Sequence, residues 1–269
     1  GFKDCKLAID ENNGDIDKSI EYLRKKGIAK ASKKMGRVAA DGLALVFEKD
    51  NEISTIEINS ETDFVAKNKD FISFCKELSE LNFQSKSNLD KLKLSKMKNQ
   101  NTVDDNLITL ISKIGEKITI RRSKYFDNNG LNFSYVHNSV EKNIGKVVSI
   151  VQLNKNNNKN LKDLGTKLAM HIAAQAPLAI DEKDINKKVL DKELEIIKDE
   201  LKNSGKKPEM IEKISKGKIK KFISDNTLLN QIWIMDTKKQ VSQIIKEYSK
   251  DSEIKVLDFV RYKVGEGID

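Results

Sequence analysis

The chain has 269 residues, of which 38% are hydrophobic and 34% are charged, and it carries a net charge of +9. This length is sufficient for two compact units with an appendage, and no uninterrupted apolar run approaches the ~18 residues of a membrane-spanning helix. The cysteines Cys5 and Cys75 are too few and too far apart for a disulfide framework or a clustered metal site. We therefore expect a cytosolic protein with two reduced thiols.

The positive charge comes almost entirely from lysine, because arginine occurs only at positions 24, 37, 121, 122 and 261. Aromatic residues make up 6% of the chain, and none alternates with a basic cluster as a base-stacking surface requires. We expect no direct contact with nucleic acid. A basic, RNA-associated ribosomal accessory protein nevertheless stays open as an alternative.

Residues 1–38 contain two short helical patterns separated by a turn at Asn12–Asp15. Gly14 suits a left-handed position, Asp15 or Asp17 can cap the second helix, and Gly27 is expected to end it. A small-residue, basic linker is predicted to follow over residues 28–40. The two-helix pattern resembles a ubiquitin-associated-type module, and taken alone it would favour a second alternative, a ubiquitin or peptide reader on an unrelated core.

The next segment predicts a strand, a turn and a second strand, followed by a helix over Phe71–Leu81. Asp63 and Phe64 lie between the second strand and this helix. In one interpretation Asp63 caps the helix and Phe64 begins its buried stripe, and the spacing alone favours this reading. In the other, Phe64 projects as an apolar wedge with a negative charge beside it. Periodicity does not decide between them.

A helix closed at Gly115 and a strand over residues 118–126 complete a first α+β unit. A strand at 145–153, a helix at 161–176 and a strand at 256–264 then repeat a similar order, which indicates an internal duplication. We expect an α+β fold in which this duplicated core has small antiparallel sheets. The first core subdomain is assigned to residues 39–140, and the second to residues 141–180 and 229–269.

Residues 181–228 form an insertion between the two parts of the second subdomain. Two amphipathic patterns flank a short turn that contains Gly205, and Pro208 stands just inside the second of them. This pattern predicts an antiparallel helical hairpin.

No arrangement typical of an enzyme is present. His137 and His171 are isolated, and His171 on its predicted helix is more often a satisfied structural histidine than a functional one. Gly217-Lys218 lacks the preceding glycine of a phosphate-binding loop. We expect a protein that is not an enzyme, with no cofactor and no bound metal.

Residues 57–67 read Glu-Ile-Asn-Ser-Glu-Thr-Asp-Phe-Val-Ala-Lys, and this run matches without a gap the signature of the translation elongation factor Ts family. Asp4-Cys5-Lys6 is similar to part of another family signature. The resemblance implies a guanine-nucleotide exchange factor that binds elongation factor Tu, both GDP-bound and nucleotide-free, in the bacterial cytoplasm rather than an organellar matrix. It also implies that the hairpin is a coiled coil, which in some members mediates a homodimer or a 2:2 complex.

The resemblance further implies a set of partner-binding residues. Asp63 and Phe64 would enter the partner's G domain near its magnesium and phosphates, and Phe64 would wedge between helices. The run Ile232–Met235 is read as a core strand rather than a partner patch, although its family equivalent lies close to the interface. The complete partner-binding set is Lys6, Thr62, Asp63, Phe64, Val65, His171, Ile234 and Met235.

Overall fold

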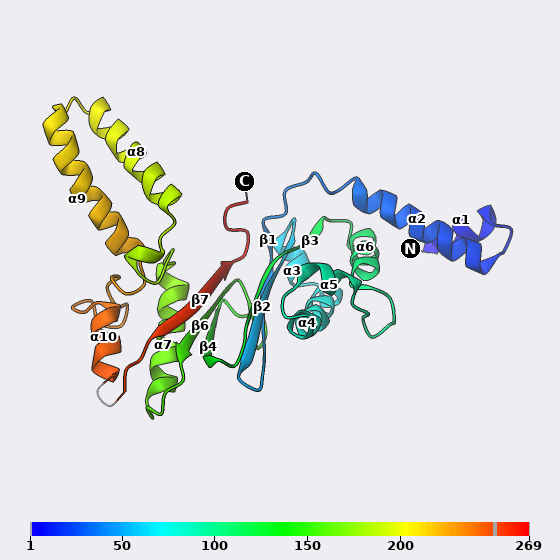
Figure 1. Ribbon diagram of the computed structural model, residues 1–269. Helices are drawn as coiled ribbons and strands as arrows, with labels where there is room; N and C mark the ends of the chain where they lie inside the picture. The colour runs from blue at the N-terminus through cyan, green and yellow to red at the C-terminus, as the bar shows by residue number, and fades with distance from the viewer. Residues whose placement is uncertain (1, 250–251, 269) are drawn as a thin grey trace. The chain divides into compact units, whose positions relative to one another are not determined.

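The computed structural model describes residues 2–249 and 252–268 (Figure 1). Within these residues the chain forms two compact units. The first holds the chain as far as Asn128, Val136–Val148 and the segment from Tyr262 onward, and the second holds Asn129–Tyr135 and Ser149–Arg261. The predicted division into four parts is finer than these two units and stays a prediction.

The first unit is built on an antiparallel sheet in the order β3-β2-β1-β5. Asp50 and Asn51 both have positive φ angles, which suit the tight turn between the first two strands. Across β2, the register with β3 shifts between Glu57 and Ile58. The strands are β1 (Asp41–Lys49), β2 (Glu52–Ser60), β3 (Ile118–Phe126) and β5 (Ile144–Gly145).

The helices α3 (Asp63–Ala66) and α4 (Lys69–Gln84) pack on β1 and β2, and the helices α5 (Leu89–Leu94) and α6 (Val103–Ile114) pack on α4 and on each other. The predicted stripe of α4 is confirmed, because Phe71, Cys75 and Leu78 are all fully buried. Asn68, not Asp63, caps this helix by accepting hydrogen bonds from the next turn. The short helix α5 lies in a lysine-rich stretch in which we predicted no element.

The N-terminal helices are α1 (Phe2–Glu11) and α2 (Ile16–Ser32). Asp15 caps α2 as expected, since its side chain accepts a hydrogen bond from the Lys18 N–H at 3.0 Å. The prediction that α2 ends at Gly27 is wrong. Gly27 is buried inside the helix without a positive φ angle, and a Cβ atom there would make only an ordinary contact, 3.7 Å from Ile108 of α6, so the helix continues through this glycine. The linker accordingly begins after Ser32.

The second sheet has the order β4-β6-β7 and carries α7 (Leu161–Gln175) and α10 (Val241–Tyr248) in its core. Its strands are β4 (Gly130–His137), β6 (Val147–Asn154) and β7 (Val256–Lys263). In both sheets two strands precede the main helix and a third follows it, and the third strand pairs with the second. This shared topology supports the predicted duplication, with β4 as the strand that the sequence analysis missed.

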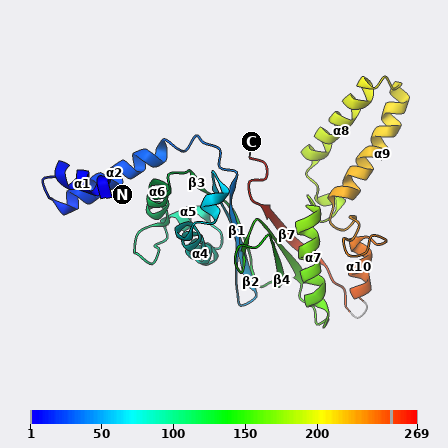
Figure 2. The same ribbon diagram turned by 180° about the vertical axis from the view of Figure 1, so that it is seen from behind.

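The predicted hairpin is confirmed as α8 (Lys187–Asn203) and α9 (Pro208–Asn226), preceded by the single turn η1 (Glu182–Asp184) and visible as a pair in Figure 2. Gly205 occupies the left-handed region in the turn, with φ of +71°. Lys218 of α9 forms an ion pair with Glu200 of α8 at 3.0 Å. The overall class is α+β, as expected. Among the described residues, no helix is long and apolar enough to cross a membrane.

Candidate functional site

The turn after β2 places Phe64 in solvent. Phe64 is the second residue of the four-residue helix α3 and is 77% exposed, whereas Val65 and Ala66 are buried in the core of the first unit. These two small apolar side chains anchor the helix, and the ring one position earlier therefore faces outward. The interpretation of Phe64 as the start of a buried stripe is wrong, and the structure shows a projecting aromatic ring.

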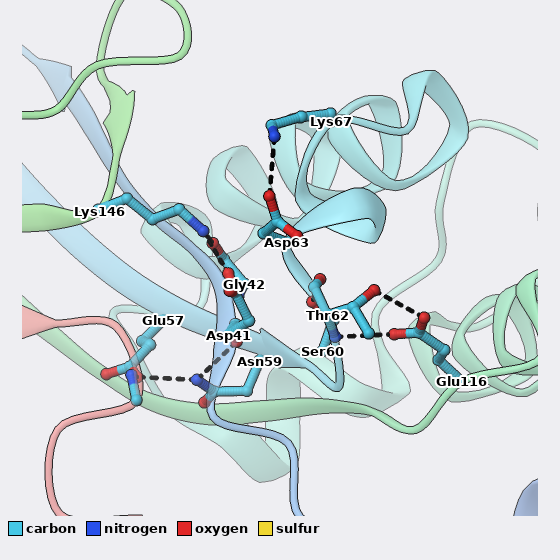
Figure 3. A network of polar contacts seen from close by, with 11 residues as sticks. Asp41, Gly42, Glu57, Asn59, Ser60, Thr62, Asp63, Lys67, Glu116 and Lys146 are labelled. Carbon is cyan, nitrogen blue, oxygen red and sulfur yellow. Dashed lines mark hydrogen bonds and ion pairs between the residues drawn. The ribbon is translucent and has the colours of Figure 1, made fainter.

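A carboxylate stands beside this ring. Asp63 accepts a hydrogen bond from the Lys67 ammonium at 2.8 Å (Figure 3). The same ammonium lies 5.9 Å from the centre of the Phe64 ring. The hydrogen bond from Lys67 holds the pKa of Asp63 below its ordinary value, and the same bond raises the pKa of Lys67. Asp63 is therefore ionised at neutral pH.

Thr62 fixes the start of this helix. Its backbone is extended, its N–H donates to Glu116 Oε2 at 3.0 Å, and its hydroxyl donates to Glu116 Oε1 at 2.7 Å (Figure 3). The Ser60 hydroxyl donates to the Thr62 carbonyl oxygen at 3.1 Å. Because both the amide and the side chain of Thr62 are hydrogen-bonded within this chain, these bonds fix the direction in which Asp63 and Phe64 leave the sheet.

The strand beneath the turn is held by a buried carboxylate. Glu57 is fully buried and accepts from Arg121 at 3.0 Å, from Arg122 at 2.5 Å and from the Gly265 N–H at 2.9 Å. Burial acts to raise the pKa of Glu57, but the Gly265 N–H, the Asn59 amide and the two guanidinium groups outweigh it and hold the pKa below its ordinary value. The charged form of Glu57 thus binds the C-terminal segment to β2.

His171, predicted as a partner-binding residue, is fully buried in the second unit. Its ring stacks on Trp233 with 5.1 Å between centres and 17° between planes. The Ile234 N–H donates to Nδ1 at 3.4 Å, and Nε2 lies 3.0 Å from Gln231 Oε1. Burial lowers the pKa of His171, against an opposing contribution from Gln231. The neutral ring therefore positions the loop around Trp233, and it has no solvent-exposed surface with which to contact a partner.

The run Ile232–Met235 is not a strand, contrary to our reading. It is a loop closed by an isolated bridge between Ile232 and Gln240. Met235 is 44% exposed and Ile234 is partly buried. The backbone instead turns at Ile234 and Met235, where the Asp236 N–H donates to the Trp233 carbonyl oxygen at 3.2 Å.

The predicted site residues therefore fall into three places. Thr62, Asp63, Phe64 and Val65 lie together in the first unit, with Val65 as a buried anchor. His171, Ile234 and Met235 lie together in the second unit, and Lys6 is exposed on α1. Sequence reasoning missed Glu116, which reaches Thr62 from 54 positions away. No local pattern marks this glutamate.

Within the part of the chain that the structure describes, no group of three or more His, Cys, Asp or Glu side chains could hold a metal ion. The fold and the site together define an α+β protein that presents an exposed aromatic ring and an ionised carboxylate on a turn held by hydrogen bonds.

Comparison with known proteins identifies the family. The family described as "Elongation factor TS" matches residues 61–266. A protein named Elongation factor Ts from Nitrobacter hamburgensis is 40% identical over 273 residues, which cover 100% of this chain and 89% of that protein. One of the same name from Rickettsia prowazekii is 40% identical over 275 residues, covering 100% and 88%. The chain belongs to the elongation factor Ts family, and this membership implies a nucleotide-exchange factor of elongation factor Tu in translation.

Proposed function

We propose that this protein binds elongation factor Tu and promotes GDP release by inserting Phe64 and Asp63 near the magnesium and phosphate site of the partner. The observation that carries this proposal is the exposure of Phe64, 77%, beside an ionised carboxylate on a turn that the protein holds in place. An exchange factor carries out no covalent chemistry. It binds the nucleotide-free partner better than the loaded one, and by linkage GDP then weakens the factor's own binding equally.

The two side chains have different tasks in this proposal. Phe64 offers an apolar ring that gains about 1.5–3 kcal/mol when it is buried between partner helices. Asp63 brings a negative charge close to a bound cation, which dominates the electrostatics of such a site, and competes with the groups that order it. The ion pair between Asp63 and Lys67 lies at the surface, where such pairs contribute little, so it can open on binding.

The magnitude of the Phe64 contribution requires a second contact. A gain of about 1.5–3 kcal/mol shifts an equilibrium by roughly 10- to 100-fold, since 1.4 kcal/mol is tenfold. A nucleotide held tightly together with magnesium requires more than this. We assign the additional binding to Lys6 and to Ile234 and Met235, with Thr62, Val65 and His171 positioning the groups that touch the partner.

A nucleotide-release experiment tests the proposal. Elongation factor Tu is loaded with fluorescent GDP in excess magnesium, and release is followed with increasing amounts of this protein. We expect a saturable acceleration. When a chelator removes magnesium beforehand, the acceleration should shrink, because the step that the protein promotes is already complete. Unchanged release in magnesium rejects the function, whereas an equal acceleration with and without magnesium rejects only the proposed site of action.

The setting of this activity follows from the relatives. The proteins named above are bacterial, and we propose the bacterial cytoplasm as the location. A homodimer or 2:2 complex through α8 and α9 stays a prediction of the resemblance.

A further inference from the structure

Two glutamates hold the turn that carries Asp63 and Phe64, and each binds the segment that carries the other. Glu116, in the loop before β3, accepts the N–H and the hydroxyl of Thr62 at 3.0 and 2.7 Å. Glu61, beside Thr62, accepts the N–H of Lys117 at 2.6 Å. We call this set of four residues, Glu61, Thr62, Glu116 and Lys117, the reciprocal clamp.

The segment that follows α2 joins the same place. The Arg37 guanidinium lies 3.2 Å from a Glu61 carboxylate oxygen, and the Lys117 ammonium donates to the Arg37 carbonyl oxygen at 2.8 Å. The Lys34 ammonium also donates to the Gly115 carbonyl oxygen. Three segments that are distant in sequence therefore meet at the base of the exposed ring.

The bonding of Thr62 differs from that of an ordinary helix cap. Thr62 occupies the N-cap position of α3, yet its hydroxyl makes no capping hydrogen bond and instead donates a hydrogen bond to Glu116. A helix of four residues has too few internal hydrogen bonds to hold its own direction. The orientation of α3 consequently depends on its buried side chains, Val65 and Ala66, and on the clamp.

The charges of the clamp suit a rigid support. The side chain of Glu61 is 19% exposed, and the backbone N–H of Lys117 is the main cause that holds its pKa below the ordinary value, with Arg37 adding to the effect and burial opposing it. Hydrogen bonds to ionised carboxylates are shorter and stronger than those between neutral groups.

We propose that Glu116 is a positioning residue for nucleotide exchange: through Thr62 it fixes the direction in which Phe64 and Asp63 project toward the partner. This inference rests on the proposed function and adds to it a residue that does not touch the partner. A ring held in its binding direction loses less conformational freedom on association, and a misplaced ring loses contacts.

The test compares Glu116→Ala and Glu116→Gln with a matched control. Glu77 is a suitable control, since its carboxylate also accepts a backbone N–H, that of Lys98, elsewhere in the first unit. We expect Glu116→Ala to lower the maximal GDP-release rate roughly tenfold, which corresponds to about 1.4 kcal/mol. Glu116→Gln should recover part of the rate because its amide oxygen still accepts one bond, and Glu77→Ala should keep the parent rate.

Two further measurements separate positioning from general destabilisation. Hydrogen exchange of the Thr62 amide should accelerate in Glu116→Ala while amides of β1 and β2 stay protected. In a mutant cycle, Glu116→Ala should add no further loss in a background that carries both Asp63→Ala and Phe64→Ala, because it acts through these two side chains. Either of two results would overturn the positioning role and leave the exchange function standing. One is that the losses in GDP-release rate are additive in this cycle. The other is that Glu116→Ala releases GDP at the parent rate in an assay in which Phe64→Ala is slower than the parent. A parent protein that does not accelerate release overturns both.

Discussion

Two aromatic side chains in this protein lie next to a polar side chain, but one is exposed to solvent and the other is buried. Phe64 is 77% exposed beside Asp63 in the first unit, whereas Trp233 is 4% exposed and stacks on His171 in the second. The difference arises from the anchors. Val65 and Ala66 tie the short helix to the core and leave Phe64 outside, while the Ile234 N–H and Gln231 bind the imidazole and draw Trp233 inward. The first arrangement is suited to recognition, and the second to holding a loop.

The largest effect should come from Trp233→Ala. Removal of a buried indole leaves a cavity and costs about 3–5 kcal/mol in the free energy of unfolding. Urea denaturation measures this loss. Ile232→Ala is the control, because Ile232 is 51% exposed and its removal should change stability by less than about 0.5 kcal/mol. A loss at Trp233 no larger than this control would show that the indole does not stabilise its unit.

A smaller loss is expected for Glu57→Gln, which keeps the size of the side chain but removes the charge that binds Arg121 and Arg122. Hydrogen bonds to charged groups contribute about 1.5–3 kcal/mol, and we expect a destabilisation in that range. Because the folded pKa of Glu57 is depressed, its contribution is complete above its ordinary pKa and disappears as the pH falls through the folded value. The exposed pair of Glu253 and Lys255 supplies the control Glu253→Gln, which should leave the free energy of unfolding unchanged. Equal stability of both variants would contradict the role of Glu57.

The titration of His171 should give a still smaller effect, which is visible in the pH dependence of stability. Burial depresses the pKa of His171 in the folded protein. Below the ordinary pKa, the unfolded chain therefore binds a proton at this histidine that the folded chain does not bind. The free energy of unfolding should therefore fall as the pH drops below about 6.5, the ordinary value. Unfolding curves at pH 8, 7, 6 and 5.5 measure this slope. His171→Gln should flatten it, and a slope that persists in that variant would assign it to another group.

The smallest effect is expected for Lys67→Met, which removes the ion pair to Asp63 at the surface. Stability should not change measurably, since exposed ion pairs contribute little. The rate of GDP release should rise slightly at low salt because Asp63 no longer shares its charge, and the difference should vanish at high salt. Release that is slower than that of the parent at every salt concentration would show that Lys67 itself contacts the partner.

Much of the fold could be predicted because its signals are local. The helical spacing in α4 and the placement of Gly205 and Pro208 around the hairpin turn were sufficient to define those elements. The alternation of Leu131, Phe133 and Tyr135 also contained the signal for β4, which our sequence analysis overlooked. Gly27 was misinterpreted because a glycine often ends a helix, whereas α2 continues through it to Ser32.

The site was predictable only in part for the same reason. The run from Thr62 to Val65 is contiguous and lies within the segment that matches the family signature. Whether Phe64 points inward or outward depends on which residues of α3 reach the core, and spacing alone favoured the wrong answer. His171 meets Gln231 from 60 positions away, and this contact makes it the structural histidine that the residues themselves favoured, not the partner-contacting residue that the resemblance implied.

The central claim is that an exposed ring beside an ionised carboxylate drives nucleotide release, and Phe64→Ala tests it most directly. Because the side chain is 77% exposed, its removal should leave the free energy of unfolding within about 0.5 kcal/mol of the parent. GDP release from elongation factor Tu, measured over a range of factor concentrations, should lose roughly 10- to 100-fold of its stimulation. A folded Phe64→Ala protein that stimulates release as well as the parent would contradict the account.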